Sequence, residues 1–310
     1  MASFSPRMSR GRVSLYTLFT GVMVALSLLF AACGSTNSGS APTSSTPAAT
    51  VKASIAAPKD LVTSGTLTVG SDTTYPPQEF VDTTTGQAVG FDIDLITAIA
   101  QHMGLKTVVK KASFDTIIDD LSAHRYDVVI SAVTINDQRK QKADFVPYFS
   151  AGESLLVQKG NPDKITTVKD LCGKNVGVQA ATVELDGLNA ASKACKAAGK
   201  PAINLTVLKD QTDVIQLLAN RRVVATYQDS PVTDYYLSQN SGQFEIGGTV
   251  VNAAAEGIAV RKGDTSMFTA MQAAFKSIKD DGTYDNLFNK WHLNAAQKIA
   301  VTESVSSSYA

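Results

Sequence analysis

The stretch RYDVVISAVTINDQR occupies residues 125–139 and decides the fold. Its apolar part, residues 127–130 (DVVI), predicts a buried β-strand that runs directly into residues 131–134 (SAVT). In open α/β sheets, polar residues at the carboxyl end of a strand lie where such sheets bind ligands. The stretch therefore indicates an α/β protein with a ligand site at this strand end.

Alternating strand and helix patterns lie on both sides of this stretch. Residues 66–69 (TLTV) predict a first strand, and residues 93–103 keep one apolar face at helical spacing before Gly104. Further along, strands are predicted at residues 176–178 and 223–227, with helical patterns between them. This alternation favours an α/β fold over a sandwich or a helix bundle.

The amino terminus predicts export. Arginines at positions 7, 10 and 12 precede an apolar run over residues 15–30, and Ala31-Ala32-Cys33 follows. We interpret residues 1–32 as a signal peptide and Cys33 as a lipidation site; the alternative is an uncleaved anchor. Residues 33–60 are rich in Ser, Thr, Pro and Ala, which predicts a flexible linker. The protein is thus expected outside the cytoplasm, joined to the membrane through the Cys33 lipid only.

Charge and length narrow the function classes. The chain has 28 basic and 28 acidic residues, and the leader holds three Arg and no acid, so the mature protein counts 25 − 28 = −3. No basic field indicates a nucleic-acid partner. About 250 residues remain to fold, enough for two lobes of ordinary domain size.

Two cysteines remain once Cys33 is assigned to the lipid. Cys172 and Cys195 form an even pair in an oxidising compartment, which predicts a disulfide. Two buried free thiols are the alternative. No metal site is expected, because neither cysteine has a nearby His or Cys partner.

Motifs spread along the chain resemble the polar amino-acid-binding proteins of bacterial ABC importers. The resemblance runs from about Leu61 to Leu293 and rests on residues 70–77 (GSDTTYPP), 90–95 (GFDIDL), 127–139, 170–174 (DLCGK), 176–179 (VGVQ), 227–229 (YQD) and 281–284 (DGTY). It implies a type II periplasmic-binding-protein fold, with two α/β lobes, each a mostly parallel sheet flanked by helices, joined by two hinge crossovers near Glu153 and Val250. Lobe 1 is expected at residues 61–153 and 250–304, lobe 2 at 154–249, and a polar tail at 305–310.

The resemblance also implies the site. The residues expected to contact the ligand are Asp72, Tyr75, Phe114, Ser131, Ala132, Thr134, Arg139, Thr182, Val183 and Asp229. Arg139 would clamp a carboxylate with two parallel charge-assisted bonds, although alone it would suggest a surface helix residue. Asp229 would receive the ammonium group, although it also suits a helix cap. Tyr75 and Phe114 would sandwich the ligand side chain, and Asp72 would meet its far end.

Backbone groups and hydroxyls would complete the contacts. Thr134 would donate from its hydroxyl, and Ala132 would contribute backbone groups. Thr182 and Val183 stand at a predicted helix N-terminus, where free amides favour a carboxylate. Ala181 and Val183 depart from the family, which usually has Gly at the first position and a second Thr or Gly at the other.

The expected function is capture of a free amino acid, polar or cationic, between the two lobes and its delivery to the transmembrane subunits of an ABC importer. No catalytic residue or cofactor is expected, and the protein is expected to be a monomer. The alternatives are a prephenate- or arogenate-type dehydratase on the same fold and a ligand-sensing receptor domain. A serine hydrolase is disfavoured because the chain has no GxSxG motif.

Overall fold

The computed structural model describes residues 53–299. The predicted signal peptide, Cys33 and the polar tail at 305–310 lie outside the described residues. The predicted linker, residues 33–60, is described only at its end, and there it is packed: the N–H groups of Ser54 and Ile55 donate to the carbonyl of His102 at 2.9 and 3.0 Å. Ile55 also packs against the neighbouring core, so the folded part begins before Leu61.

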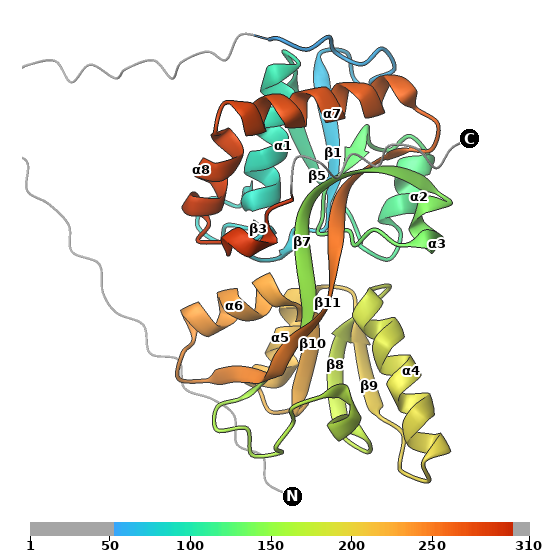
Figure 1. The fold of residues 1–310 in the computed structure, drawn as a ribbon, viewed down its shortest axis with the longest axis vertical. Helices are drawn as coiled ribbons and strands as arrows, with labels where there is room; N and C mark the ends of the chain where they lie inside the picture. Colours follow the sequence, from blue (N-terminus) through green and yellow to red (C-terminus); the bar gives the residue numbers. More distant parts are fainter. Residues whose placement is uncertain (1–52, 300–310) are drawn as a thin grey trace, which may run out of the picture. The chain divides into compact units, whose positions relative to one another are not determined.

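One mixed sheet runs through both lobes (Figure 1). In spatial order its eight strands are β5 (Lys106–Lys111), β1 (Thr66–Ser71), β6 (Val128–Val129), β11 (Phe244–Arg261), β7 (Ala143–Gln158), β10 (Ala225–Asp229), β8 (Asn175–Gln179) and β9 (Asn204–Leu208). The outer three strands of each lobe are parallel to one another, whereas β7 and β11 are antiparallel to their neighbours. The α/β prediction is confirmed, with the difference that two long shared strands join the lobe sheets into one.

A small antiparallel sheet and most helices belong to the first lobe. The small sheet consists of β2 (Thr74–Tyr75), β3 (Glu79–Val81) and β4 (Ala88–Val89). The first lobe carries α1 (Phe91–His102), α2 (Ile117–Ser122), α3 (Asp137–Lys140), α7 (Thr265–Asp280), α8 (Thr283–Lys290) and the short η2 (Ala295–Gln297). The second lobe carries η1 (Val168–Leu171), α4 (Val183–Ala197), α5 (Gln211–Ala219) and α6 (Ser230–Gln239). Figure 1 shows the two sets of helices separated along β7 and β11.

Each lobe has its own apolar core. In the first lobe, the fully buried Phe91 of α1 lies 5.0 Å, between ring centroids, from Phe288 of α8. Truncation of such a ring to Ala costs about 3–5 kcal/mol, because a cavity adds to the lost transfer free energy. In the second lobe, separate clusters around Leu188 and Ile215 belong to α4 and α5. Separate cores allow the lobes to move as units.

The two shared strands form the connection between the lobes. β7 and β11 pair along most of their length, with shifts of register between Gly247 and Val251 and again before Ala254. Gly152 of β7 faces this irregular part, and a Cβ at position 152 would lie 2.5 Å from the Val250 side chain. The crossover positions predicted at Glu153 and Val250 lie inside these strands, and we propose them as the lobe boundaries.

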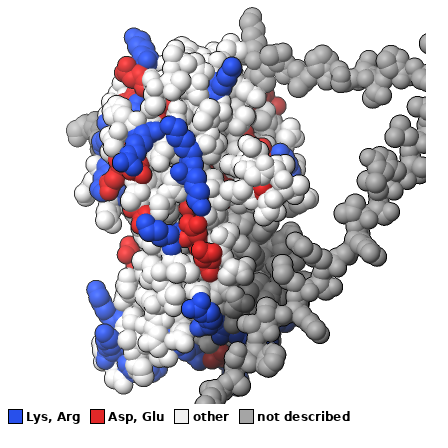
Figure 2. Space-filling model, turned by 180° about the vertical axis from the view of Figure 1, so that it is seen from behind, with Lys and Arg blue, Asp and Glu red and all other residues white. Residues whose placement is uncertain are grey.

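Charged side chains are distributed without a continuous field of one sign on the face seen in Figure 2. Several of them form exposed ion pairs, such as Lys142 with Asp119 at 2.6 Å and Lys209 with Asp115 at 3.2 Å. Among residues 53–299, no helix is both long enough and apolar enough to cross a membrane.

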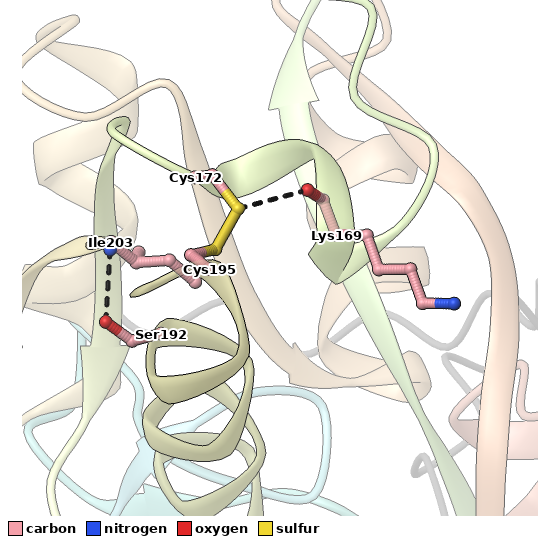
Figure 3. Close-up of a disulfide and its surroundings, with 5 residues drawn as sticks. All are labelled: Lys169, Cys172, Ser192, Cys195 and Ile203. Atoms are coloured by element: carbon pink, nitrogen blue, oxygen red, sulfur yellow. Dashed lines mark hydrogen bonds between the residues drawn. A yellow bond between two sulfur atoms is a disulfide. The ribbon is translucent and has the colours of Figure 1, made fainter. Parts of the chain in front are cut away.

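A disulfide staples the second lobe (Figure 3). The structure joins Cys172, just after η1, to the buried Cys195 of α4, as expected from the sequence. One helical turn earlier, the hydroxyl of Ser192 accepts a hydrogen bond from the Ile203 N–H at 3.1 Å. These links fix the carboxyl-terminal half of α4, whose other end faces the cavity described next.

Candidate functional site

A cavity lies between the lobes, where several strands end. Its lining residues are Asp72, Tyr75, Glu79, Phe114, Ser131, Ala132, Thr134, Arg139, Gln179, Thr182, Val183, Glu184 and Asp229. The structure therefore brings all ten residues expected at the site to one cavity. Glu79, Gln179 and Glu184 also line it, although the sequence motifs did not predict them.

Arg139 provides the one guanidinium in the lining. It lies in α3, where the Asn136 side chain caps the helix by accepting from the Arg139 N–H at 2.8 Å. The guanidinium lies over the Phe114 ring, 5.3 Å from its centroid, and donates to the carbonyls of Thr134 at 2.7 Å and Ala181 at 3.1 Å. A guanidinium has five N–H donors, so it retains donors for an anion in the cavity. This placement differs from that of a solvent-facing helix Arg.

Asp229 faces the cavity from the other lobe. It ends β10 and occupies the N-cap position of α6, but its side chain makes no capping hydrogen bond. The carboxylate instead accepts from the Tyr75 hydroxyl at 3.0 Å, and the Asp229 N–H donates to the same hydroxyl oxygen at 3.0 Å. Burial raises the pKa of Asp229 to about 6, although the hydrogen bond from Tyr75 opposes the shift. A cationic group placed here would favour the ionised carboxylate.

Asp72 contributes a second carboxylate to the cavity. Its Oδ2 accepts from Thr74 Oγ1 and from Gln179 Nε2, both at 2.7 Å, and the second of these bonds crosses between the lobes. Its Oδ1 is buried and has no hydrogen-bond partner among the described residues. Burial raises the pKa of Asp72 to about 6. The free oxygen can accept from a ligand donor.

Ser131 and Thr182 use their hydroxyls within the protein. Ser131 Oγ accepts from the Asp72 N–H at 3.0 Å and donates to Glu79 at 2.9 Å. Thr182 Oγ1 donates to the Gln179 carbonyl at 3.0 Å and caps α4 by accepting from the Leu185 N–H at 3.2 Å. Contacts from residue 182 to a ligand would therefore come from its backbone.

Two alanines at the cavity have left-handed backbones. The φ angles are 46° at Ala132 and 61° at Ala181, a region that costs a residue with a Cβ roughly 1 kcal/mol or more. This explains why Gly is usual at position 181 in the family that the sequence resembles. At this strained position the Ala181 carbonyl accepts from Arg139, which ties the lobe 2 turn to lobe 1.

Glu184 is the residue that most changes the chemistry expected of the site. It lies in the first turn of α4, is 2 % exposed, and its carboxyl group interacts with that of Asp229. With Asp72 and Glu79 it brings the lining to four carboxyl groups against one guanidinium, but burial raises the pKa of Glu79 and Glu184 well above its ordinary value, so Asp72 and Asp229 are the groups that ionise most readily. Such a cavity favours a ligand that carries more positive than negative charge.

The missed residues differ in how visible they are in the sequence. Gln179 ends β8, so the rule that strand ends hold ligands could have identified it. An acid in the first turn of a helix, such as Glu184, is ordinarily a partner of the helix dipole and gives no separate signal. Glu79 belongs to a three-residue strand whose pattern is too short to show which face is buried.

Comparison with known proteins places these features in a family. The model of bacterial extracellular solute-binding proteins, family 3, matches residues 67–294. The L-cystine-binding protein TcyJ of Escherichia coli (strain K12) is 32 % identical over 228 residues, which is 73 % of this chain and 82 % of TcyJ.

Solved structures agree with this. An ancestral arginine-binding protein bound to glutamine is 38 % identical with a TM-score of 0.67, over 74 % of this chain and 98 % of that one. The ancestral amino acid-binding protein AncCDT-1, a precursor of cyclohexadienyl dehydratase, is 35 % identical with a TM-score of 0.64, over 73 % and 95 %.

The fold and the interlobe cavity thus define a two-lobed binding protein of the type II periplasmic class. The chain belongs to the bacterial extracellular solute-binding proteins, family 3.

Proposed function

We propose that this protein captures a free amino acid with a cationic side chain between its lobes and delivers it to an ABC importer. The observation that carries the proposal is the placement of opposite charges across one cavity. Arg139 faces it from lobe 1 and Asp229 from lobe 2, and the free oxygen of Asp72 provides a third polar point. An amino acid with a cationic side chain needs one site that binds its carboxylate and two sites that bind its positively charged groups.

The proposed contacts follow from these positions. Arg139 binds the ligand carboxylate, Asp229 binds the ammonium group, and Asp72 binds the distal cation, while Tyr75 and Phe114 cover the aliphatic stem. Charge-assisted hydrogen bonds contribute about 1.5–3 kcal/mol each. The contacts to the ligand carboxylate and ammonium group alone therefore form a large share of the binding free energy at micromolar affinity, which is about −8 kcal/mol. Because the ligand contacts both lobes, it favours the closed state.

Titration calorimetry with the twenty amino acids, L-ornithine and L-cystine tests this proposal. We expect L-arginine, L-lysine or L-ornithine to bind at least about tenfold more tightly than L-glutamine, because the Asp72 and Asp229 carboxylates face the cavity with one guanidinium. Asp72→Asn should reduce this preference while leaving the binding of L-glutamine within about threefold. If no amino acid binds, the transport function is wrong; if L-glutamine binds most tightly, the cationic preference is wrong.

A dehydratase is the second candidate, and Glu184 is the observation that favours it. A buried carboxyl group that keeps its proton can act as a general acid toward a departing hydroxyl. Against this, the carboxylate of Asp229 would repel the second carboxylate of a prephenate-type acid. Incubation with prephenate, followed by ultraviolet absorbance, should show no product; turnover that Glu184→Gln abolishes would replace binding by catalysis as the function.

We also propose that Cys33 carries a lipid and that the leader is removed. In cells, Cys33→Ser should shift the protein from the membrane fraction to the medium or periplasm, because the substitution removes the lipid that is its only proposed attachment to the membrane. A Cys33→Ser variant that stays in the membrane fraction would favour the uncleaved anchor instead.

A further inference from the structure

Glu184 and Asp229 form a pair of carboxyl groups at the point where the ligand ammonium is expected. Both side chains are buried, at 2 % and 6 % exposure, and both line the cavity. The two carboxyl groups interact with each other, and a buried pair of this kind disfavours two negative charges, so one of the two groups holds a proton. The other oxygen of Glu184, Oε1, has no partner among the described residues.

We propose that Glu184 and Asp229 share one proton in the ligand-free site, and that an incoming ammonium group displaces this proton to solvent, so that amino-acid binding is coupled to proton release. This inference rests on the proposed function. Before binding, the pair holds one proton and one negative charge. After binding it holds two negative charges facing the ligand cation, and the released proton is taken up by water or buffer.

The groups facing the pair come from every element packed around it. They are Tyr227 on β10, Glu153 on β7, Glu256 on β11, Tyr75 on β2 and Arg139 next to α4. Arg139 is the one cation in this set, and it also serves the ligand carboxylate. Glu153 and Glu256 are further acids in this set, and the Tyr227 hydroxyl donates to Glu153. An additional positive charge beside Glu184 and Asp229 would therefore stabilise the ionised form of both carboxyl groups.

The direction of the titration supports the coupling. Burial raises the pKa of Asp229 to about 6, and burial together with the charge of Asp229 raises the pKa of Glu184 well above its ordinary value. An ammonium group beside the pair lowers both values, because it stabilises the ionised forms. Affinity for an amino acid therefore rises with pH until Glu184 ionises in the free protein, and its acid limb lies near pH 6, where Asp229 gains a proton.

Glu184→Gln is the test, because the amide keeps the shape and can donate permanently to Asp229. The matched control is Glu245→Gln on β11, a carboxyl that does not line the cavity and contacts Lys159 at 3.8 Å. L-Arginine is titrated by calorimetry between about pH 5.5 and 8.5, in paired buffers of different ionisation enthalpy, which counts the protons released. Circular dichroism and thermal unfolding check that both variants fold.

We expect the original protein and Glu245→Gln to release protons and to bind up to about tenfold more tightly per pH unit above pH 6.5. Glu184→Gln should release almost none in this range, and its affinity should change less than about twofold per pH unit. Equal proton counts in all three proteins would overturn the inference. If none of the twenty amino acids, L-ornithine and L-cystine binds, the proposed function fails instead, and the two failures are thus distinguishable.

Discussion

The hydroxyl of Tyr75 offers the sharpest test of how the lobes close. It lies in lobe 1 and makes two bonds to Asp229 in lobe 2, one to the carboxylate and one from the N–H, both at 3.0 Å. Tyr75→Phe removes both bonds and keeps the ring that faces the cavity. A hydrogen bond to a charged group contributes about 1.5–3 kcal/mol and a neutral one about 0.5–1.5 kcal/mol, so closure loses roughly 2–4 kcal/mol.

The expected effect on binding is at the lower end of that range. Water can reach the freed groups when the lobes open, so we expect about 2 kcal/mol, or roughly 30-fold weaker binding. The substitution also removes a hydrogen bond that holds the pKa of Asp229 down, so more Asp229 is neutral near pH 7. Both changes weaken ligand binding, while the thermal unfolding midpoint should stay within a few degrees, because the bonds lie between the lobes.

Calorimetry at about pH 7.5 measures the affinity, and small-angle X-ray scattering without ligand measures the fraction of closed molecules. Tyr236→Phe is the matched control. Tyr236 packs against the apolar cluster that contains Tyr75, and its hydroxyl makes no hydrogen bond within residues 53–299. Binding by Tyr75→Phe within threefold of the original protein would refute the reasoning, as would an equal loss in the control.

Three further predictions concern Arg139, the disulfide of the second lobe and the buried aspartates. Arg139→Lys should weaken amino-acid binding by about 100-fold, because an ammonium group cannot make the paired bonds of a guanidinium; calorimetry showing less than tenfold loss would contradict the assigned role. The double variant Cys172→Ser with Cys195→Ser should lose about 3 kcal/mol of stability in chemical denaturation, given the sequence separation of 23, and an unchanged midpoint would argue against this. The thermal midpoint should fall as pH rises from about 4 to about 6.5: burial raises the pKa of Asp72 and Asp92 from 3.8 to about 6, so stabilisation present below about pH 4 is lost through about pH 6. A midpoint that rises over this range would contradict that sign.

Local patterns were sufficient to predict the α/β class, whereas the resemblance to the polar amino-acid-binding proteins supplied most of the residues that meet at the cavity. Strand ends and helix starts are short-range features, so Ser131 and Thr182 could be placed by counting from the apolar runs beside them. The motifs around Arg139 and Asp229 then supplied their partners from the other lobe by resemblance. These positions agree with the structure because sheet topology brings parallel strand ends to one edge.

Features that depend on long-range packing could not be predicted. The shared strands β7 and β11 extend over 16 and 18 residues, but Gly152 and the polar residues near Asn252 interrupt the apolar pattern that would show it. The direction of Glu184 depends on how α4 docks on lobe 2, and an acid in a first helical turn has the same local pattern whether it faces solvent or a cavity. From the sequence alone, the hydroxyl of Thr182 could bind a ligand or cap a helix equally well. The three-dimensional backbone determines which of the two it does.

The paired strands β7 and β11 also bear on how this protein could change its affinity during evolution. Two hydrogen-bonded strands resist stretching, so the lobes can move mainly by bending and twisting of the strands where their register shifts, near Gly152 and Val251. No residue of that segment lines the cavity. Substitutions there alter the balance between open and closed molecules, and that balance multiplies the affinity for every amino acid by the same factor. Overall affinity and ligand specificity can therefore evolve through substitutions at separate sets of residues.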